Sequence, residues 1–221
     1  MKDSEYTPPA SLQKVLRKYQ RDGYRWLRTL DGYGMGGILA DDMGLGKTVQ
    51  VLSYLLAMKQ NGQTLPSLIV CPASLVLNWA EECQKFTPEL SCVVVDGDAA
   101  HRAELAESWP AADLVVTSYD LLRRDEALYE GQEFYACILD EAQAIKNHTT
   151  QKYKAVCQVR SQVRFALTGT PVENRLGELW SIFSFLMPGY LPPYKNFCAR
   201  FEKPIVQEED ANAVRRLNQL T

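Results

Sequence analysis

Residues 36–50, GGILADDMGLGKTVQ, decide the fold of this chain. In this stretch an apolar run leads into a glycine-rich loop, and a helical pattern begins near Lys47. Gly44 and Gly46 let backbone N–H groups turn inward around phosphate oxygens, and the N-terminus of the following helix adds positive potential. Lys47 is expected to reach the β- and γ-phosphates of a nucleotide, and the Thr48 hydroxyl to bind Mg²⁺. The stretch therefore predicts a phosphate-binding loop between a strand and a helix.

This loop departs from the general phosphate-loop pattern. The pattern G-x-x-x-x-G-K-[ST] requires a glycine five residues before Gly46, and that position is Asp41. An ordinary loop followed by a helix is therefore an alternative when the segment is taken alone. The remaining motifs of the chain decide between the two interpretations.

Short apolar runs alternate with helical patterns along the chain, which predicts a sheet built from βαβ units. Continuous apolar runs suit strands that are covered by helices on both faces, as in parallel sheets. We therefore predict a three-layer α/β fold with a mostly parallel central sheet. The six predicted strands are residues 36–40, 68–71, 92–95, 114–117, 136–139 and 165–168.

Apolar residues at helical spacing predict the helices. One helix, from Leu12 to Leu30, precedes the first strand, and a second follows Lys47. A late amphipathic helix runs from Leu176 to Met187. Beyond residue 204 the pattern weakens into a segment with an acidic start and a basic end, as a helix dipole favours.

The composition excludes several classes of protein. The chain has 221 residues, a formal charge of −3, 46% hydrophobic and 23% charged residues, which argues against disordered, collagen-like and coiled-coil chains. This length suits one large domain. No apolar stretch reaches the roughly 20 residues that span a bilayer, and the N-terminus lacks the apolar core of a secretory signal, so we expect a cytoplasmic protein without a membrane partner. The six cysteines are scattered and form no C-x-x-C pair, which indicates reduced thiols.

A second motif, ACILDEAQAIKN at residues 136–147, carries two adjacent carboxylates. Its strand delivers Asp140 and Glu141 at its carboxyl end, the edge where ligands bind in open α/β sheets. One carboxylate can hold Mg²⁺ while the other positions or deprotonates the water that attacks the γ-phosphate. A solvated acidic pair that opens a helix is the alternative. The upstream phosphate loop favours the catalytic interpretation.

A third motif, FALTGTP at residues 165–171, ends an apolar strand in small hydroxyl residues. Thr168 and Thr170 stand on either side of Gly169. Taken alone, this segment could be an ordinary turn. Its order after the other two motifs makes it informative.

Together, the ordered motifs resemble those of the Swi/Snf-type DNA-dependent ATPases of helicase superfamily two. The resemblance runs from about residue 12 to about residue 205. It accounts for Asp41, because this family writes its phosphate loop as D-E/D-M-G-L-G-K-T. It implies a RecA-like, helicase-type ATP-binding lobe at residues 1–205, and residues 206–221 that start the connection to a second RecA-like lobe. The matching segments are LRKYQRDGYRWL, DDMGLGKT, VCPASLVLNWAEE, VTSYDLLRRD, DEAQAIKN and LTGTPVENRLGELWSIFSFLMPG.

The resemblance also implies roles for residues of the nucleotide site. Gln20 would read the adenine of ATP. Asp140 and Thr48 would hold Mg²⁺, Lys47 would bind phosphate, and Glu141 would be the catalytic base. The segment implied to bind the cofactor comprises Asp42, Met43, Gly44, Leu45, Gly46, Lys47 and Thr48.

A further set of residues would couple the nucleotide state to movement of the lobes. Gln143 stands where many relatives have histidine, and the spelling DEAQ resembles the prokaryotic branch of the family. A cytoplasmic protein of this family would be nucleoid-associated in a prokaryote, and the protein would be nuclear in a eukaryote. The coupling residues are Gln143, Thr168, Gly169 and Thr170.

Contacts to double-stranded DNA are expected at the strand ends away from the nucleotide. They would mainly involve phosphates, which position a protein on DNA without reading its sequence. The net charge of −3 does not indicate DNA binding. Arg123 and Arg124 form a small basic cluster that could contact DNA or could equally be a solvated surface. The expected DNA contacts are Ser74, Asn78, Thr117 and Ser118.

Every motif found here belongs to the first lobe of such a motor. Relatives carry arginine fingers on the second lobe, which contribute about 10³ to 10⁵ in rate, or roughly 4 to 7 kcal/mol. We therefore expect the chain alone to bind ATP–Mg²⁺ and DNA weakly, with little turnover. The parent protein would translocate on double-stranded DNA and remodel protein–DNA complexes. The alternatives are a nucleotide- or DNA-binding module without turnover, and a P-loop kinase that transfers phosphate to a small molecule without DNA.

Overall fold

The six strands of the computed structural model form one parallel sheet, in the order β1-β6-β5-β2-β4-β3. The structure describes residues 6–40, 44, 46–169 and 176–220. All six predicted strands are confirmed, and the last two begin earlier than their apolar runs because the polar residues Glu133 and Arg160 already pair with each other. The strands are β1 (Gly37–Leu39), β2 (Ser67–Cys71), β3 (Cys92–Val94), β4 (Leu114–Ser118), β5 (Glu133–Leu139) and β6 (Arg160–Leu167).

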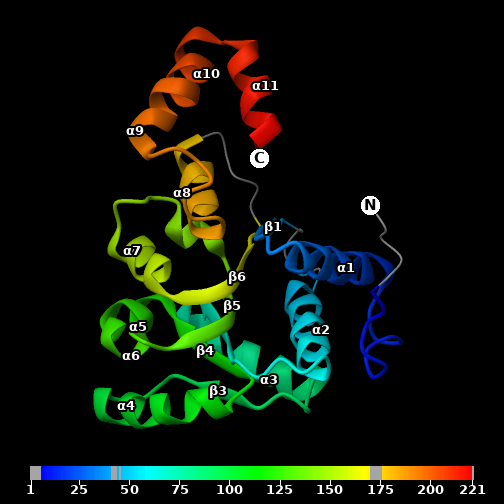
Figure 1. Ribbon diagram of the computed structural model, residues 1–221. Coiled ribbons are helices and arrows are strands. Elements are labelled where there is room, and N and C mark those ends of the chain that lie inside the picture. Colours follow the sequence, from blue (N-terminus) through cyan, green and yellow to red (C-terminus); the bar gives the residue numbers. More distant parts are fainter. Residues whose placement is uncertain (1–5, 41–43, 45, 170–175, 221) are drawn as a thin grey trace.

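Helices cover both faces of the sheet, so the predicted three-layer α/β fold is confirmed (Figure 1). Alternate residues of β2 belong to different cores: Ile69 and Cys71 pack with α1, α2 and α3, and Leu68 and Val70 pack on the other face. This follows from the two-residue period of a strand. The first face carries α1 (Lys18–Gly32), α2 (Lys47–Gln60) and α3 (Val76–Phe86), and the second carries α4 (Ala99–Ser108), α5 (Tyr119–Arg124), α6 (Glu126–Tyr129), α7 (Gln151–Gln158) and α8 (Leu176–Leu186).

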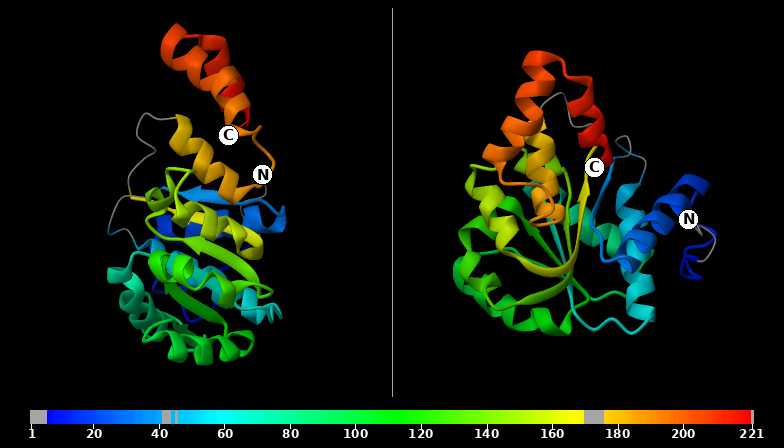
Figure 2. Two further views of the ribbon diagram at one scale, coloured as in Figure 1. Left: turned by 90° about the vertical axis from the view of Figure 1, so that its left-hand side faces the viewer. Right: turned by 45° about the horizontal axis from the view of Figure 1, so that its top comes forward.

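A helical extension stands on α8, outside the three layers (Figure 2). It has a small core of its own, made by Leu191, Phe197, Phe201 and Leu217. A division of the chain at residue 205 would cut through the middle of α10, so the boundary between the lobe and its connection stays a prediction. The elements of the extension are α9 (Tyr194–Phe197), the π-helix η4 (Cys198–Glu202), α10 (Lys203–Glu208) and α11 (Ala211–Leu220).

The first helix begins later than its apolar pattern predicts. Residues 10–15 form turns, and α1 starts at Lys18 after the extended residue Arg17. Its start is fixed by Gln20, whose Oε1 accepts a hydrogen bond from the Arg17 backbone N–H at 2.9 Å, because such a side chain satisfies a donor that the helix itself cannot. Leu12 is nevertheless buried, so its apolar character reflects packing of the turn rather than a helix.

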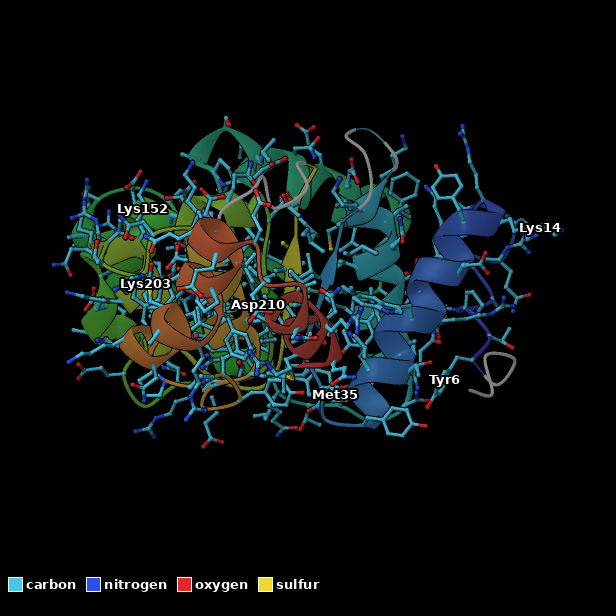
Figure 3. All side chains as sticks on the ribbon, turned by 90° about the horizontal axis from the view of Figure 1, so that it is seen from above. Tyr6, Lys14, Met35, Lys152, Lys203 and Asp210 are labelled. Atoms are coloured by element: carbon cyan, nitrogen blue, oxygen red, sulfur yellow. The ribbon has the colours of Figure 1, made fainter. Side chains whose placement is uncertain are left out.

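The amino-terminal turn lies on the outer side of α1. Figure 3 shows Tyr6 and Lys14 at this end of the molecule, and Lys152 and Lys203 at the opposite end. Within the described part of the chain, no helix is both long and apolar enough to cross a membrane. Three short 3₁₀ helices follow strand or helix ends: η1 (Ala73–Leu75), η2 (Trp109–Ala111) and η3 (Ala142–Ile145).

Candidate nucleotide-binding site

The parallel sheet brings the three motifs to one edge. β6 lies between β1 and β5, and all three strands point the same way. Lys47 follows β1, Thr168 follows β6 and Asp140 follows β5. Because the carboxyl ends of parallel neighbours meet at the same edge of a sheet, residues far apart in the sequence form one candidate site there.

The phosphate loop has the backbone that its glycines predict. Gly44 and Gly46 have φ values of 81° and 73°, which lie in the left-handed region that residues other than glycine rarely adopt. Gly46 precedes α2, and among the described residues no side-chain hydrogen bond caps the N-terminus of this helix. The N-terminus of a helix favours an anion through its backbone N–H groups and its dipole, so this end of α2 suits a phosphate. Asp41, Asp42, Met43 and Leu45, which the sequence analysis includes in this loop, lie outside the described residues.

Gln20 lies beside the phosphate loop, although it comes from a different helix. Its side chain is 8% exposed, and a Cβ atom at Gly46 would stand 2.5 Å from its Nε2 atom. The packing of α1 on α2 therefore joins two segments that the sequence analysis assigns to one site. The role of Gln20 toward adenine stays a prediction.

Asp140 is the most enclosed carboxylate among the described residues of the site, with 8% of its surface exposed. Its Oδ2 atom accepts a hydrogen bond from Nε1 of Trp79 at 2.9 Å, and its Oδ1 atom accepts one from the backbone N–H of Glu141 at 2.9 Å. Burial raises the pKa of Asp140 above its usual value, while these two hydrogen bonds and the nearby charge of Lys47 act in the opposite direction. The carboxylate is thus held in one orientation close to the lysine of the phosphate loop.

Glu141 has a left-handed backbone, with φ at 49°. Such a conformation costs of order 1–3 kcal/mol for a residue other than glycine, and residues of this kind cluster at functional sites. The Gln143 amide donates a hydrogen bond to Oε2 of Glu141 at 2.6 Å, and Oγ1 of Thr168 donates one to Oε1 of Gln143 at 3.2 Å. The amide of Gln143 therefore connects the end of β5 to the end of β6.

The structure thus brings together two of the predicted coupling residues, Gln143 and Thr168. Thr168 is 2% exposed, so its hydroxyl faces the protein rather than solvent. Gly169 directly follows it and is half-buried. Thr170 lies outside the described residues. The coupling role itself stays a prediction.

Two of the four predicted DNA contacts are not exposed. Thr117 is fully buried, and Ser118 is 4% exposed. The Ser118 hydroxyl accepts a hydrogen bond from the backbone N–H of Leu121 and caps α5. The burial of the last residues of β4 between two helical layers explains this, and neither side chain offers a surface to DNA in this arrangement.

The other two predicted DNA contacts, Ser74 and Asn78, are exposed. They follow β2, whose carboxyl end lies at the same edge as that of β1. Burial raises the pKa of Glu82, on the same helix as Asn78, whereas the side chains of Asn78 and Thr48 act in the opposite direction. Contact of Ser74 and Asn78 with DNA stays a prediction.

Sequence reasoning missed Trp79 and Glu82 as residues of this site. Both lie in the segment VCPASLVLNWAEE, which the resemblance assigns to the DNA side. Their spacing of three residues places them on one face of α3, and α3 begins at the carboxyl end of β2, next to β5. The sequence therefore indicates that Trp79 and Glu82 share a face of a helix. Only the order of the strands shows that this face lies next to the motif at the end of β5.

The residues at this edge fit Mg²⁺. Mg²⁺ bound to a nucleotide takes one or two protein oxygens and completes its shell with phosphates and water. The Asp140 carboxylate and the Thr48 hydroxyl supply oxygens of the preferred kind. No cluster of three or more His, Cys, Asp or Glu side chains suited to a metal occurs among the residues that the structure describes. Asp140 and Thr48 would hold the ion together with the phosphates of a bound nucleotide.

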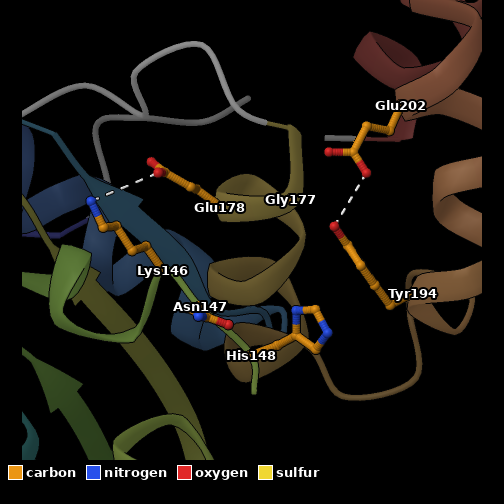
Figure 4. Close-up of a pocket in the computed structure, with 7 residues that line it drawn as sticks. All are labelled: Lys146, Asn147, His148, Gly177, Glu178, Tyr194 and Glu202. Carbon is orange, nitrogen blue, oxygen red and sulfur yellow. Dashed lines mark hydrogen bonds and ion pairs between the residues drawn. The ribbon is translucent and has the colours of Figure 1, made fainter. Parts of the chain in front are cut away.

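A separate polar pocket of about 580 Å³ lies next to this edge, between the segment after η3 and the helices α8, α9 and η4 (Figure 4). Nζ of Lys146 lies 3.9 Å from Oε1 of Glu178, and the Tyr194 hydroxyl donates a hydrogen bond to Glu202 at 3.2 Å. The His148 ring packs against the Tyr194 ring, with 4.1 Å between their centroids. The pocket therefore joins the end of the second motif to the helical extension. Its lining residues are Lys146, Asn147, His148, Gly177, Glu178, Tyr194 and Glu202.

Comparisons with known proteins agree on one family. The family model described as "SNF2-related domain" matches residues 19–221. The chain is 42% identical over 216 residues to the TATA-binding protein-associated factor mot1 of Aspergillus fumigatus. This match covers 92% of this chain and 11% of that protein. It is 40% identical over 218 residues to the putative ATP-dependent helicase/translocase YwqA of Bacillus subtilis. This match covers 98% of this chain and 24% of that protein.

A solved structure matches as well. The SWI2/SNF2 ATPase core of Sulfolobus solfataricus in complex with dsDNA superimposes with a TM-score of 0.86 and 40% sequence identity. The match covers 93% of this chain and 42% of that chain. This chain therefore spans less than half of the solved relative, and less than a quarter of the length of each of the two curated relatives.

Proposed function

Because this chain belongs to the SNF2-related family, we propose that it is the ATP-binding lobe of an ATPase that translocates on double-stranded DNA and remodels protein–DNA complexes. Its fold is the RecA-like α/β fold of that family's ATPase core. The observation that carries the proposal is the meeting of Lys47 and Thr48 with Asp140 and Glu141 at one edge of the sheet. These four residues supply the functions that phosphoryl transfer to water requires.

In the proposed mechanism, each residue has one role at this edge of the sheet. Lys47 and the first N–H groups of α2 bind the β- and γ-phosphates. Thr48 and Asp140 would hold Mg²⁺, which when bound would supply neutralisation of negative charge on the phosphates. Glu141 orients the attacking water and accepts its proton, and the hydrogen bond from Gln143 keeps this carboxylate in place.

DNA and a second lobe complete the proposal. The solved relative was determined with dsDNA, and the fungal relative is named as a factor associated with the TATA-binding protein. A DNA-bound protein is therefore the proposed target of remodelling, in the cytoplasm of a prokaryote or the nucleus of a eukaryote. The second RecA-like lobe would supply arginine fingers, which contribute about 10³ to 10⁵ in rate. Without that second lobe, this chain would turn over ATP very slowly.

The test is the ATPase rate of the parent protein, and of this chain alone, with duplex DNA, with single-stranded DNA and without DNA. Glu141→Gln in each protein serves as the blank. We expect duplex DNA to raise the rate of the parent protein, and the rate of the chain alone to stay near the blank. Stimulation by single-stranded DNA only would contradict translocation on a duplex. Phosphate transfer to a small acceptor without DNA would instead identify a kinase.

A further inference from the structure

We propose that Trp79 is a positioning residue of the nucleotide site, whose indole N–H orients the Asp140 carboxylate and so ties helix α3 to the binding of Mg²⁺. The inference rests on the proposed function, because Asp140 holds Mg²⁺ only if the site binds a nucleotide. Trp79 does not reach the nucleotide itself in this proposal. It acts through Asp140.

The geometry of the contact supports a positioning role. Trp79 is fully buried, and its Nε1 atom lies 2.9 Å from Oδ2 of Asp140, 61 positions away in the sequence. An indole is a donor only, so this bond always occupies a lone pair of the carboxylate. The backbone N–H of Glu141 occupies a lone pair of Oδ1. Two fixed donors therefore leave a defined part of the carboxylate open to a cation, and hydrogen bonds to a charged acceptor are stronger than neutral ones.

Helix α3 also packs against α2, the helix that begins with Lys47 and Thr48. A shift of α3 would move the Trp79 indole and with it the orientation of the Asp140 carboxylate, which is the property expected of a residue that orients a metal ligand.

A second tryptophan shows what packing alone looks like in this chain. Trp109 is also fully buried, on the opposite face of the sheet, where its ring centroid lies 4.7 Å from that of Tyr129. Within the described part of the chain its Nε1 atom has no hydrogen-bond partner. Trp109→Phe therefore removes the same N–H group and a similar volume as Trp79→Phe, but leaves Asp140 untouched. It is the matched control.

The first experiment measures the affinity of a fluorescently labelled ADP for the chain by anisotropy, in EDTA and over a series of Mg²⁺ concentrations. We expect all three proteins to bind the nucleotide equally in EDTA. Loss of a residue that orients a metal ligand typically weakens metal affinity by about 10- to 100-fold. Trp79→Phe should therefore require at least about tenfold more Mg²⁺, while Trp109→Phe should follow the wild type. Equal Mg²⁺ dependence of the two variants would overturn the proposal.

A second measurement needs no nucleotide. Amide hydrogen exchange reports the bond from the Glu141 N–H to Asp140, which depends on the orientation of that carboxylate. We expect faster exchange at Glu141 in Trp79→Phe than in Trp109→Phe, and equal exchange would overturn the inference. Faster exchange in a chain that binds no labelled ADP would support the positioning of Asp140 by Trp79 and would contradict the proposed function alone.

Discussion

Substitution of Gly46 by alanine should damage the phosphate loop in two ways that the structure separates. The residue has φ at 73°, and a left-handed conformation costs a residue with a side chain roughly 1–2 kcal/mol. The added methyl group would also stand 2.5 Å from Nε2 of Gln20. Displacement of that side chain breaks the hydrogen bond from the Arg17 N–H to Gln20, which is worth about 0.5–1.5 kcal/mol. We therefore expect Gly46→Ala to lower the free energy of unfolding by about 1.5–3.5 kcal/mol.

Gly131→Ala is the control for the first of these costs. Gly131 has φ at 79°, and a Cβ atom there would have no neighbour within 4 Å. Gly131→Ala should therefore lower the free energy of unfolding by about 1–2 kcal/mol. Urea denaturation of the wild type and both variants gives the change in the free energy of unfolding that each substitution causes. The dependence of this free energy on urea concentration should be the same in all three proteins. Nucleotide affinity should fall in Gly46→Ala and stay unchanged in Gly131→Ala. Equal losses of stability together with equal nucleotide affinities would refute the placement of Gln20 against the loop.

Three further predictions concern single groups. Glu141→Gln should abolish DNA-stimulated ATP hydrolysis by the parent protein while labelled-nucleotide binding survives, and residual hydrolysis at the wild-type rate would show that another group is the base. Tyr135→Phe removes a hydroxyl that donates to the Asp31 carboxylate at 2.6 Å, so urea denaturation should show a loss of about 1.5–3 kcal/mol. Because burial raises the pKa of Asp140 above its ordinary value, Mg²⁺-dependent nucleotide binding should weaken on acidification at a higher pH than it would for an ordinary aspartate. The folded state binds this proton more tightly than the unfolded state, so the contribution of Asp140 to stability falls as pH rises from its unfolded-state pKa to its folded-state pKa. Asp140→Asn should remove that part of the pH dependence.

The sequence predicts the sheet well because its strands are buried on both faces. A strand such as β2 is apolar from Leu68 to Cys71 and is buried at every position in the structure, so its apolar run predicts it. The starts of β5 and β6 are different. Glu133 and Arg160 are exposed and pair through backbone atoms, and a polar residue in such a position carries no signal of its strand.

The sequence predicts which motifs form the site, but not every contact within it. Lys47 and Asp140 are implied by local patterns at strand ends, and parallel pairing brings them together. The burial of Thr117 depends on the layers that cover β4, and the bond from Trp79 depends on β2 and β5 being neighbours. The order of the strands and the packing of the helices over them are determined by the whole chain, so a local sequence pattern does not predict them.

The binding of labelled ADP with Mg²⁺ to this chain, compared with Lys47→Ala, tests the central claim most directly. Lys154→Ala, which removes an exposed lysine of α7, is the control for loss of charge. We expect Lys47→Ala to bind about 10- to 100-fold more weakly, because a hydrogen bond to a charged group is worth about 1.5–3 kcal/mol, while Lys154→Ala binds as the wild type does. Equal affinity of all three proteins would contradict the assignment of this edge of the sheet as a nucleotide site.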